Sequence, residues 1–352
     1  MSLSEFDPFF LDPIPVPRVW GGSRLLTELH PSLETPVDGV GRPLPIGETW
    51  EVSDVGDHPA LHSSITTGVH RGKTLRALLR EDSLGILGRA GTARDLAGEI
   101  QLPLLFKFID AREDLSVQVH PSDALLAQRG LPGRGKSEAW VILDAAPGSR
   151  LIVGFDDGWD FDRYLASVRA GDGEEGLRSV AVCRGDVVEL PAGLVHAIGG
   201  RILLAEIQQS SDITWRLYDW GRVGLDGQPR ELHLDACAGI EPPEPAPPCP
   251  LKNLKSPLGN DRWQRPIDGE HFRLDSWSGA GKCVRVDRRS DRFGLLVLLE
   301  GENAALWGGA EPLPLGAGSV VFVPARAPAT LEIRSTGQIW ALWMEPGDPR
   351  RD

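Results

Sequence analysis

Short apolar runs separated by turn residues dominate the hydrophobic pattern of this chain. Each run is rich in β-branched or bulky side chains and is bounded by Gly, Pro, Asp or Ser, as strands are. The pattern predicts strands at residues 104–109, 115–120, 139–143, 187–190, 202–208 and 214–218. Closely spaced short strands of this kind are typical of an antiparallel sandwich or barrel.

Helical periodicity is limited to two segments. Residues 74–87 place Leu75, Leu78 and Leu79 on one face, with charged residues between them. Residues 161–168 place apolar residues at four- and three-residue spacing. Both segments are predicted to be small helices attached to a β core.

A proline-rich stretch divides the chain. Residues 241–250 read Glu-Pro-Pro-Glu-Pro-Ala-Pro-Pro-Cys-Pro, and neither a helix nor a central strand tolerates that proline density. We expect a first domain at 1–240 with a small helical segment around 72–100, a linker at 241–252 and a second β domain at 253–352.

The second domain repeats part of the first. Residues Gly318 to Pro324 have the same spacing as Gly185 to Pro191. His196 follows Pro191 by five residues, whereas Ala329 stands at the matching place after Pro324. The repeat predicts a duplicated barrel whose second copy has lost its metal ligands.

Composition excludes several classes of protein. The formal net charge of −13 argues against a broad nucleic-acid-binding surface. The four cysteines are dispersed without a CxxC pair, as expected in a reducing compartment. No signal peptide and no membrane-spanning run is recognisable, so a cytoplasmic location is expected.

Four residues can form one metal site. Gln118 and His120 are two apart, so on a strand they share a face. Glu138 and His196 can complete a set of two imidazoles, one carboxylate and one amide oxygen. Such a set suits Zn²⁺, and it also suits Fe²⁺ or Mn²⁺. The pattern G-x5-P-x-G-x2-H that ends at His196, preceded by Q-x-H, resembles the two-part motif of the cupin superfamily.

Several ordered motifs make the resemblance closer. They are Val-Trp-Gly-Gly at 19–22, Gly-Glu-Thr-Trp-Glu-Val-Ser at 47–53, Phe-Lys-Phe-Ile-Asp-Ala at 106–111, Leu-Ser-Val-Gln-Val-His-Pro at 115–121, Gly-Lys-Ser-Glu-Ala-Trp at 135–140, Pro-Ala-Gly-Leu-Val-His-Ala-Ile at 191–198 and Ser-Asp-Ile-Thr-Trp-Arg-Leu-Tyr-Asp-Trp-Gly-Arg at 211–222. Together they resemble the type I mannose-6-phosphate isomerases in their shorter bacterial form. The resemblance implies a mainly β fold of two cupin-type (jelly-roll) β-barrels with a small helical insertion.

The resemblance also implies a chemistry. It implies one Zn²⁺ per chain and interconversion of mannose 6-phosphate and fructose 6-phosphate through an enediol. The metal ligands implied are Gln118, His120, Glu138 and His196. The catalytic residues implied are Arg216, Glu206 and Lys136, and the substrate-binding residues are Ser116, Lys136 and Arg222.

Some of these residues could instead have purely structural roles. Glu206 could form a salt bridge with Arg216, and Arg222 could be a turn residue. Lys107 could line the cavity or pair with an acid such as Glu48 or Glu51. No role is assigned to the remaining histidines, which are His30, His58, His62, His70, His233 and His271. The Gly-Lys-Ser at 135–137 lacks the strand and helix of a nucleotide-binding loop.

Two other functions share the same sequence features. One is an iron-dependent cupin oxygenase, and the other is a carbohydrate-binding cupin without turnover. The Gln118 position and the cations Lys136, Arg216 and Arg222 favour the isomerase. The expected partner is a small sugar phosphate, with no nucleic acid and no membrane, and the expected state is a monomer or weak homodimer.

Overall fold

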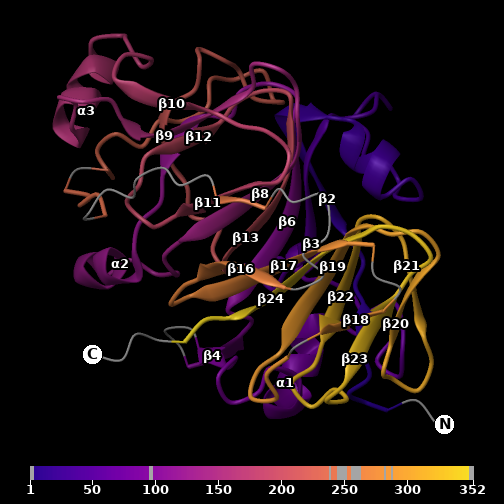
Figure 1. The fold of residues 1–352 in the computed structure, drawn as a ribbon. Helices are drawn as coiled ribbons and strands as arrows, with labels where there is room; N and C mark the ends of the chain where they lie inside the picture. Colours follow the sequence, from indigo (N-terminus) through magenta and orange to yellow (C-terminus); the bar gives the residue numbers. More distant parts are fainter. Residues whose placement is uncertain are drawn as a thin grey trace.

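The structure is a computed structural model that describes residues 4–94, 98–237, 239–243, 252–254, 263–280, 283–286 and 288–348. Most of the proline-rich linker predicted at 241–252 lies outside these described residues. Four larger sheets follow one another from the upper left to the lower right of Figure 1, and a two-stranded ribbon, β4 (Ala93–Arg94) with β5 (Ile100–Gln101), accompanies them.

Two sheets are built almost entirely from the first part of the chain. The seven-stranded sheet has the order β15 (Lys252–Asn253), β11 (Asp186–Leu190), β8 (Glu138–Ala145), β13 (Ile202–Gln209), β6 (Leu104–Ala111), β2 (Ile14–Gly22) and β3 (Ile46–Val52). The five-stranded sheet has the order β10 (Leu177–Ala181), β9 (Arg150–Phe155), β12 (His196–Ile198), β7 (Val117–Val119) and β14 (Trp215–Tyr218). Together they form the first sandwich.

The other two sheets form the second sandwich. The six-stranded sheet has the order β1 (Phe9–Phe10), β22 (Ser319–Val323), β19 (Gly294–Glu300), β24 (Ile339–Pro346), β17 (Phe272–Gly279) and β16 (Gln264–Asp268). The four-stranded sheet has the order β18 (Cys283–Val286), β23 (Leu331–Arg334), β20 (Ala304–Trp307) and β21 (Leu313–Leu315). Strand β1 comes from the N-terminal region, so both ends of the chain contribute to this sandwich.

Strand order supports the repeat that the sequence predicts. The run β11-β8-β13-β6 in the first sandwich corresponds to β22-β19-β24-β17 in the second, and β10-β9-β12-β7 corresponds to β21-β20-β23-β18. Gly185 and Gly318 both adopt positive φ, 87° and 82°, and each leads into the corresponding strand. Ala329 is exposed in the connection before β23, whereas His196 begins β12 and is buried.

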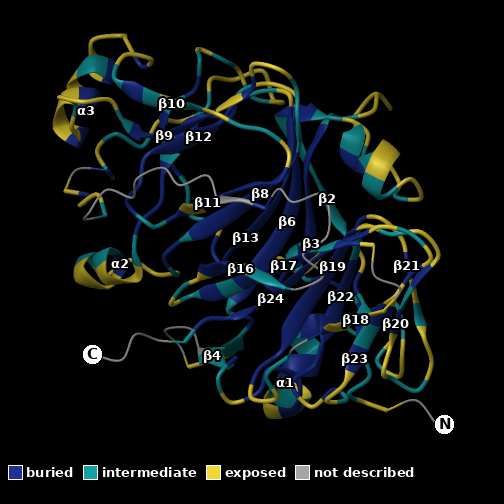
Figure 2. Cartoon of the chain, viewed as in Figure 1, coloured by how far each residue is buried: buried dark blue, intermediate teal, exposed yellow. Residues whose placement is uncertain are grey.

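The largest hydrophobic core lies between the two sandwiches. The side chains of Phe106, Phe108 and Val141 from the seven-stranded sheet pack in one cluster with those of Leu295 and Phe322 from the six-stranded sheet. Figure 2 shows the central strands of both sheets buried along their length. These strands are covered on both faces, which explains why their sequences are nearly continuous apolar runs.

Few helices accompany the sheets, as the sequence predicts. Helix α1 (Leu75–Ile86) begins after the N-cap Thr74 and contributes Leu78 and Leu79 to the core between the sandwiches. Helix α3 (Phe161–Arg169) packs against the outer face of the five-stranded sheet. Of the residues that the structure describes around 72–100, only those of α1 are helical, and residues 93–94 pair with 100–101 in the ribbon described above.

Some elements were not predicted from the sequence. These are helix α2 (Asp123–Arg129), the π-helix η1 (Leu25–Leu29), the 3-10 helix η2 (Pro59–Leu61) and several strands. Strand β2 contains Pro15 and Pro17, and its pairing with β3 shifts register at Pro17. Proline cannot donate to a ladder, so its presence conceals a strand of this irregular kind.

Candidate metal centre and cavity

The candidate site lies between the two sheets of the first sandwich. Strand residues alternate between faces, so Gln118 and Arg216 point inward while their neighbours Val117, Val119 and Trp215 join the outer cluster under α3. Gln118 is directly opposite His196 on β12 and opposite Arg216 on β14. The strand pattern therefore brings the predicted residues to one face.

Two histidines present their Nε2 atoms to a common point. Nδ1 of His120 lies 2.9 Å from the carbonyl oxygen of Ile213, and Nδ1 of His196 lies 2.8 Å from that of Leu194. Nδ1 therefore carries the proton in each ring, and the lone pair remains on Nε2, as in metal-binding histidines. Burial lowers the pKa of His120 well below its ordinary value and that of His196 to about 4, so both are neutral at pH 7.

Glu138 supplies a buried carboxylate to the same point. Its oxygens lie 3.2 Å from Nε2 of His196 and 3.5 Å from Nε2 of His120, and Nζ of Lys136 lies 2.6 Å from Oε2. One ligand atom from each of the three residues lies within 4.8 Å of the others. Ligand atoms bound tetrahedrally at about 2.0–2.2 Å are about 3.4 Å apart, so the three residues fit one metal ion.

Gln118 is the fourth member predicted from the sequence. Its side-chain amide nitrogen lies 3.3 Å from Nε2 of His196. A half-turn of the amide exchanges nitrogen and oxygen, and oxygen is the atom that a metal would take. The structure therefore brings Gln118, His120, Glu138 and His196 together.

A chain of buried charges leads away from this centre. Nζ of Lys136 lies 2.6 Å from Oε2 of Glu138 and 3.8 Å from Oε1 of Glu206. Lys107 then links Glu206, at 3.4 Å, to Glu48, at 3.5 Å. Acids and bases alternate along the chain, so each buried charge has an opposite neighbour.

The pKa values of these buried charged groups follow from burial and from the neighbouring charges. Burial raises the pKa of Glu206, and Lys107 only partly offsets that rise. Burial lowers the pKa of Lys136, but Glu138 and Glu206 outweigh it and the net change is upward. Lys136 is therefore a stable cation, while Glu206 is a carboxyl group poised to exchange a proton nearer neutral pH.

Glu206 forms no salt bridge with Arg216 in the described structure. Its Oε2 accepts a hydrogen bond of 3.2 Å from Nε1 of Trp140, and its ion-pair partners are the two lysines. Lys107 pairs with Glu48 and lines the cavity, whereas Glu51 pairs with His30 instead. The alternative pairing of Glu206 with Arg216, considered from the sequence, is therefore wrong.

An open cavity of about 420 Å³ adjoins the centre. Its wall includes the predicted residues Ser116, Gln118, Lys136, Glu206 and Arg216. It also includes residues that were not predicted from the sequence to belong to the site, namely Arg18, Trp20, Trp50, Asp212, Thr214 and Arg230. The volume is of the order expected for a small-molecule site.

Three arginines gather on this wall although the chain as a whole is acidic. Burial lowers the pKa of Arg216, and the charges of Arg230 and Arg18 lower it further. Nη1 of Arg216 donates to the carbonyl of Glu231 at 2.8 Å. Positive charges held close together repel one another, and a bound anionic ligand would offset that repulsion.

Arg222 lies beside this cluster rather than on the cavity wall. Asp219 accepts a hydrogen bond of 2.7 Å from Nη2 of Arg222 and two from Arg230, at 2.7 and 2.9 Å. Both arginines belong to the loop that follows β14. Arg230 reaches the cavity, and Arg222 is not among its lining residues.

Sequence signals for the additional wall residues are weak. Arg18 is two positions before Trp20, so on a strand both face the same way, which is a signal that could have been used. Arg230 lies in an irregular loop, where no periodicity predicts its direction.

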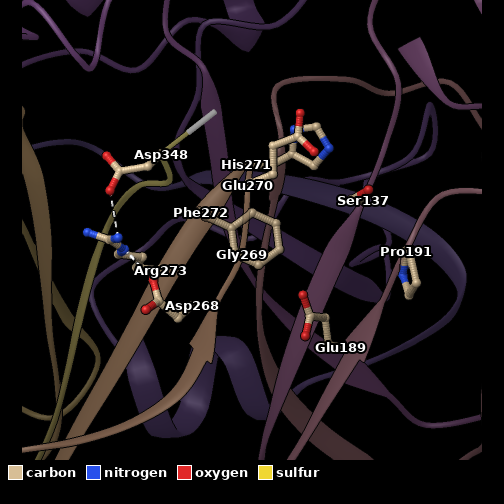
Figure 3. A pocket seen from close by; sticks show the side chains of 10 residues that line it. All are labelled: Ser137, Glu189, Pro191, Asp268, Gly269, Glu270, His271, Phe272, Arg273 and Asp348. Atoms are coloured by element: carbon tan, nitrogen blue, oxygen red, sulfur yellow. Dashed lines mark hydrogen bonds and ion pairs between the residues drawn. The ribbon is translucent and has the colours of Figure 1, made fainter. Parts of the chain in front are cut away.

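Another cavity, of about 440 Å³, lies between the sandwiches (Figure 3). Ser137 and Glu189 line it from one side, and Asp268, Arg273 and Asp348 from the other. Arg273 is paired with both aspartates there. The acidic lining is unsuited to a phosphorylated ligand, and the metal-binding residues do not reach it.

The fold and the donor set define a β-sandwich protein with a candidate metal site. Residues 10–131 match the family model "Phosphomannose isomerase type I, catalytic domain". Mannose-6-phosphate isomerase ManA of Bacillus subtilis is 31% identical over 307 residues, which cover 86% of this chain and 88% of that protein. No helix in the described residues is long and apolar enough to cross a membrane.

Solved structures agree with this relationship. The crystal structure of a mannose 6-phosphate isomerase from Bacillus subtilis has a TM-score of 0.76 and 26% identity, over 96% of this chain and 99% of that one. A variant of phosphomannose isomerase from Salmonella typhimurium shares the fold, with a TM-score of 0.66 and 19% identity over 96% of this chain and 99% of that one. The chain belongs to the type I mannose-6-phosphate isomerase family.

Proposed function

We propose that this protein is a zinc-dependent isomerase that interconverts mannose 6-phosphate and fructose 6-phosphate. The observation that carries the proposal is the convergence of His120, Glu138 and His196 beside a cavity with Lys136 and Glu206 on its wall. Gln118 completes the donor set. Bound zinc would supply a Lewis acid that polarises the sugar oxygens and stabilises developing negative charge.

The isomerisation moves one proton between neighbouring carbons. A base removes the proton from C2, the C1 carbonyl oxygen gains a proton, and an enediol results. The proton is then delivered to C1 as the C2 hydroxyl loses its own. We assign the carbon-bound proton to Glu206, because burial raises its pKa and it lines the cavity. Lys136 would donate hydrogen bonds to the sugar oxygens.

Arg18 and Arg230 would hold the phosphate, and Arg216 beside them remains a predicted catalytic residue. Arg216, Arg230 and Arg18 line the cavity, and Arg216 and Arg230 donate hydrogen bonds to residues that follow β14. Charge-assisted bonds from guanidinium groups to phosphate are strong and directional. Ser116 lines the same cavity and offers a hydroxyl. Arg222 remains a predicted substrate-binding residue. It would act indirectly, through its hydrogen bond to Asp219.

We further propose that the two sandwiches are cupin-type jelly rolls and that the second has a structural role. The matching strand orders and the exposed Ala329 support this. We also propose that the protein is cytoplasmic and is a monomer or weak homodimer, and a cytoplasmic location fits four cysteines dispersed without a CxxC pair.

One experiment separates the isomerase from its rivals. The purified protein is analysed for bound metal and assayed for conversion of fructose 6-phosphate to mannose 6-phosphate, with and without a chelator. Zinc content with chelator-sensitive turnover supports the proposal. Zinc-loaded protein without turnover favours a carbohydrate-binding cupin, and bound iron with oxygen consumption favours an oxygenase. Full activity after complete metal removal refutes the metal-dependent mechanism.

A further inference from the structure

Lys136 is held in the cavity by a segment that belongs to no helix or strand. Residues 131–137, between α2 and β8, are irregular, so no regular ladder fixes the backbone that carries this lysine. Its side chain is nevertheless buried, and its Nζ lies within 3.1 Å of Nε2 of His120. A long side chain in such a segment needs some other means of fixing its position.

Two side chains outside the cavity provide it. Oδ1 of Asp123 accepts a hydrogen bond of 2.7 Å from the backbone N–H of Gly135, and Oδ2 accepts one of 2.8 Å from the amide of Gln209. Oε1 of Gln209 in turn accepts a bond of 2.9 Å from the N–H of Ser137. We name these two residues the Asp123–Gln209 clamp, because they grip the backbone on both sides of Lys136.

The backbone around the clamp also makes hydrogen bonds and one close approach that depend on its position. The N–H of Lys136 donates to the carbonyl of Pro121 at 3.1 Å, and the N–H of Gln209 donates to that of Ser137 at 3.0 Å. A Cβ on Gly135 would lie 2.5 Å from the backbone nitrogen of Asp123, so only glycine allows this approach. The donors and acceptors of the clamp are also fixed. The carboxylate of Asp123 accepts from two N–H donors, and the amide oxygen of Gln209 accepts from a third.

We propose that Asp123 and Gln209 are positioning residues that set the place of Lys136 in the reaction. Neither lines the cavity, so neither would touch the sugar. The inference rests on the proposed function, in which Lys136 contacts the substrate. A displacement of about 1 Å at a reacting group costs up to about 100-fold in rate, so a loosened clamp should reduce kcat.

The test exchanges the charges of the clamp. In Asp123→Asn an amide N–H group replaces one carboxylate oxygen, so two amide donors face each other at Gln209. In Gln209→Glu the amide donor is lost, so two carboxylates face each other. We expect kcat to fall about 10- to 100-fold in each single variant. In Asp123→Asn/Gln209→Glu every donor again faces an acceptor and the net charge is unchanged, so kcat should return to within about threefold of the native value.

Controls separate positioning from general damage. Asp162→Asn alters the first-turn acid of α3, as Asp123→Asn does for α2, and should leave kcat unchanged. Zinc content should remain near one per chain in all clamp variants, because Glu138 is fixed in β8. Single variants with native kcat would overturn the proposal. If a single variant does not fold, the double variant decides, and a folded, zinc-loaded double variant with low kcat overturns the inference.

Failure of the inference is distinguishable from failure of the proposed function. Native protein without isomerase activity, or a Lys136→Ala variant with native activity, refutes the role on which the inference depends. Loss of activity in Lys136→Ala, together with native activity in both single clamp variants, refutes the inference alone.

Discussion

Replacing Arg230 with alanine tests how the cavity would hold a phosphorylated sugar. The Nε and Nη2 groups of Arg230 donate to Asp219, so Nη1 is the nitrogen left for a phosphoryl oxygen. A hydrogen bond to a charged group contributes about 1.5–3 kcal/mol, which corresponds to a change of about 10- to 150-fold in affinity. We therefore expect Arg230→Ala to lower kcat/KM for fructose 6-phosphate by about that factor, mainly through KM.

The fold should tolerate this change. Asp219 keeps its ion pair with Arg222, so removal of Arg230 does not leave a buried carboxylate alone. The loss in free energy of unfolding should be about 1–3 kcal/mol, because two hydrogen bonds to Asp219 are removed, as measured by urea denaturation. Arg42→Ala removes an exposed arginine paired with Asp38 and provides the charge-matched control.

Unphosphorylated fructose and inorganic phosphate make the assay specific. Any turnover of fructose should be unaffected by Arg230→Ala, while inhibition by inorganic phosphate should weaken about 10-fold or more. A parallel fall for fructose and fructose 6-phosphate would refute the assignment of Arg230 to the phosphate. Arg222→Ala acts only through Asp219, so its loss in kcat/KM should be smaller than that of Arg230→Ala.

Four further predictions follow from the site. His120→Ala should lose both zinc and activity, whereas Arg216→Ala should keep zinc and lose activity, as metal analysis and the isomerase assay will show. Chelation should abolish activity and added zinc should restore it, and activity that persists without metal would contradict the proposed role of the ion. Because burial lowers the pKa of His196 to about 4 against 6.5 in an exposed residue, the free energy of unfolding of metal-free protein should fall by about 3 kcal/mol as the pH is lowered from about 6.5 to about 4, and a flat profile in urea denaturation would contradict this. Gly135→Ala should lower the free energy of unfolding by about 1–3 kcal/mol, because its Cβ meets the backbone of Asp123, and an unchanged melting temperature would show that the segment can shift.

The sequence predicted most of the strands around the site, including β6 with Lys107 and β13 with Glu206, but not β12, which begins at the predicted metal ligand His196. Runs such as 104–109 and 202–208 are apolar enough to be identified, and the two-residue spacing of Gln118 and His120 correctly predicted a shared face. Helices 74–87 and 161–168 were found by periodicity within one or two residues. The local sequence pattern is sufficient to predict a helix or strand that has a clear apolar run or periodicity of its own.

Contacts that depend on tertiary packing could not be predicted from the sequence. Nothing in the local sequence indicates that Arg230 reaches the cavity while Arg222 does not, because the course of the loop decides it. The partners of Glu206 were also uncertain, since Lys107 is about one hundred positions away and meets it only through pairing of β6 with β13. Helix α2 is only seven residues long and lacks a clear periodic pattern, so it was missed.

The core shared by the two large sheets has a consequence for the evolution of this chain. A duplicated unit that loses its chemistry is ordinarily free to be deleted. Here, deletion of residues 253–352 would expose Phe106, Phe108 and their neighbours on a broad apolar sheet to water. Selection for solubility alone would therefore retain the second sandwich, whether or not it carries any chemistry of its own.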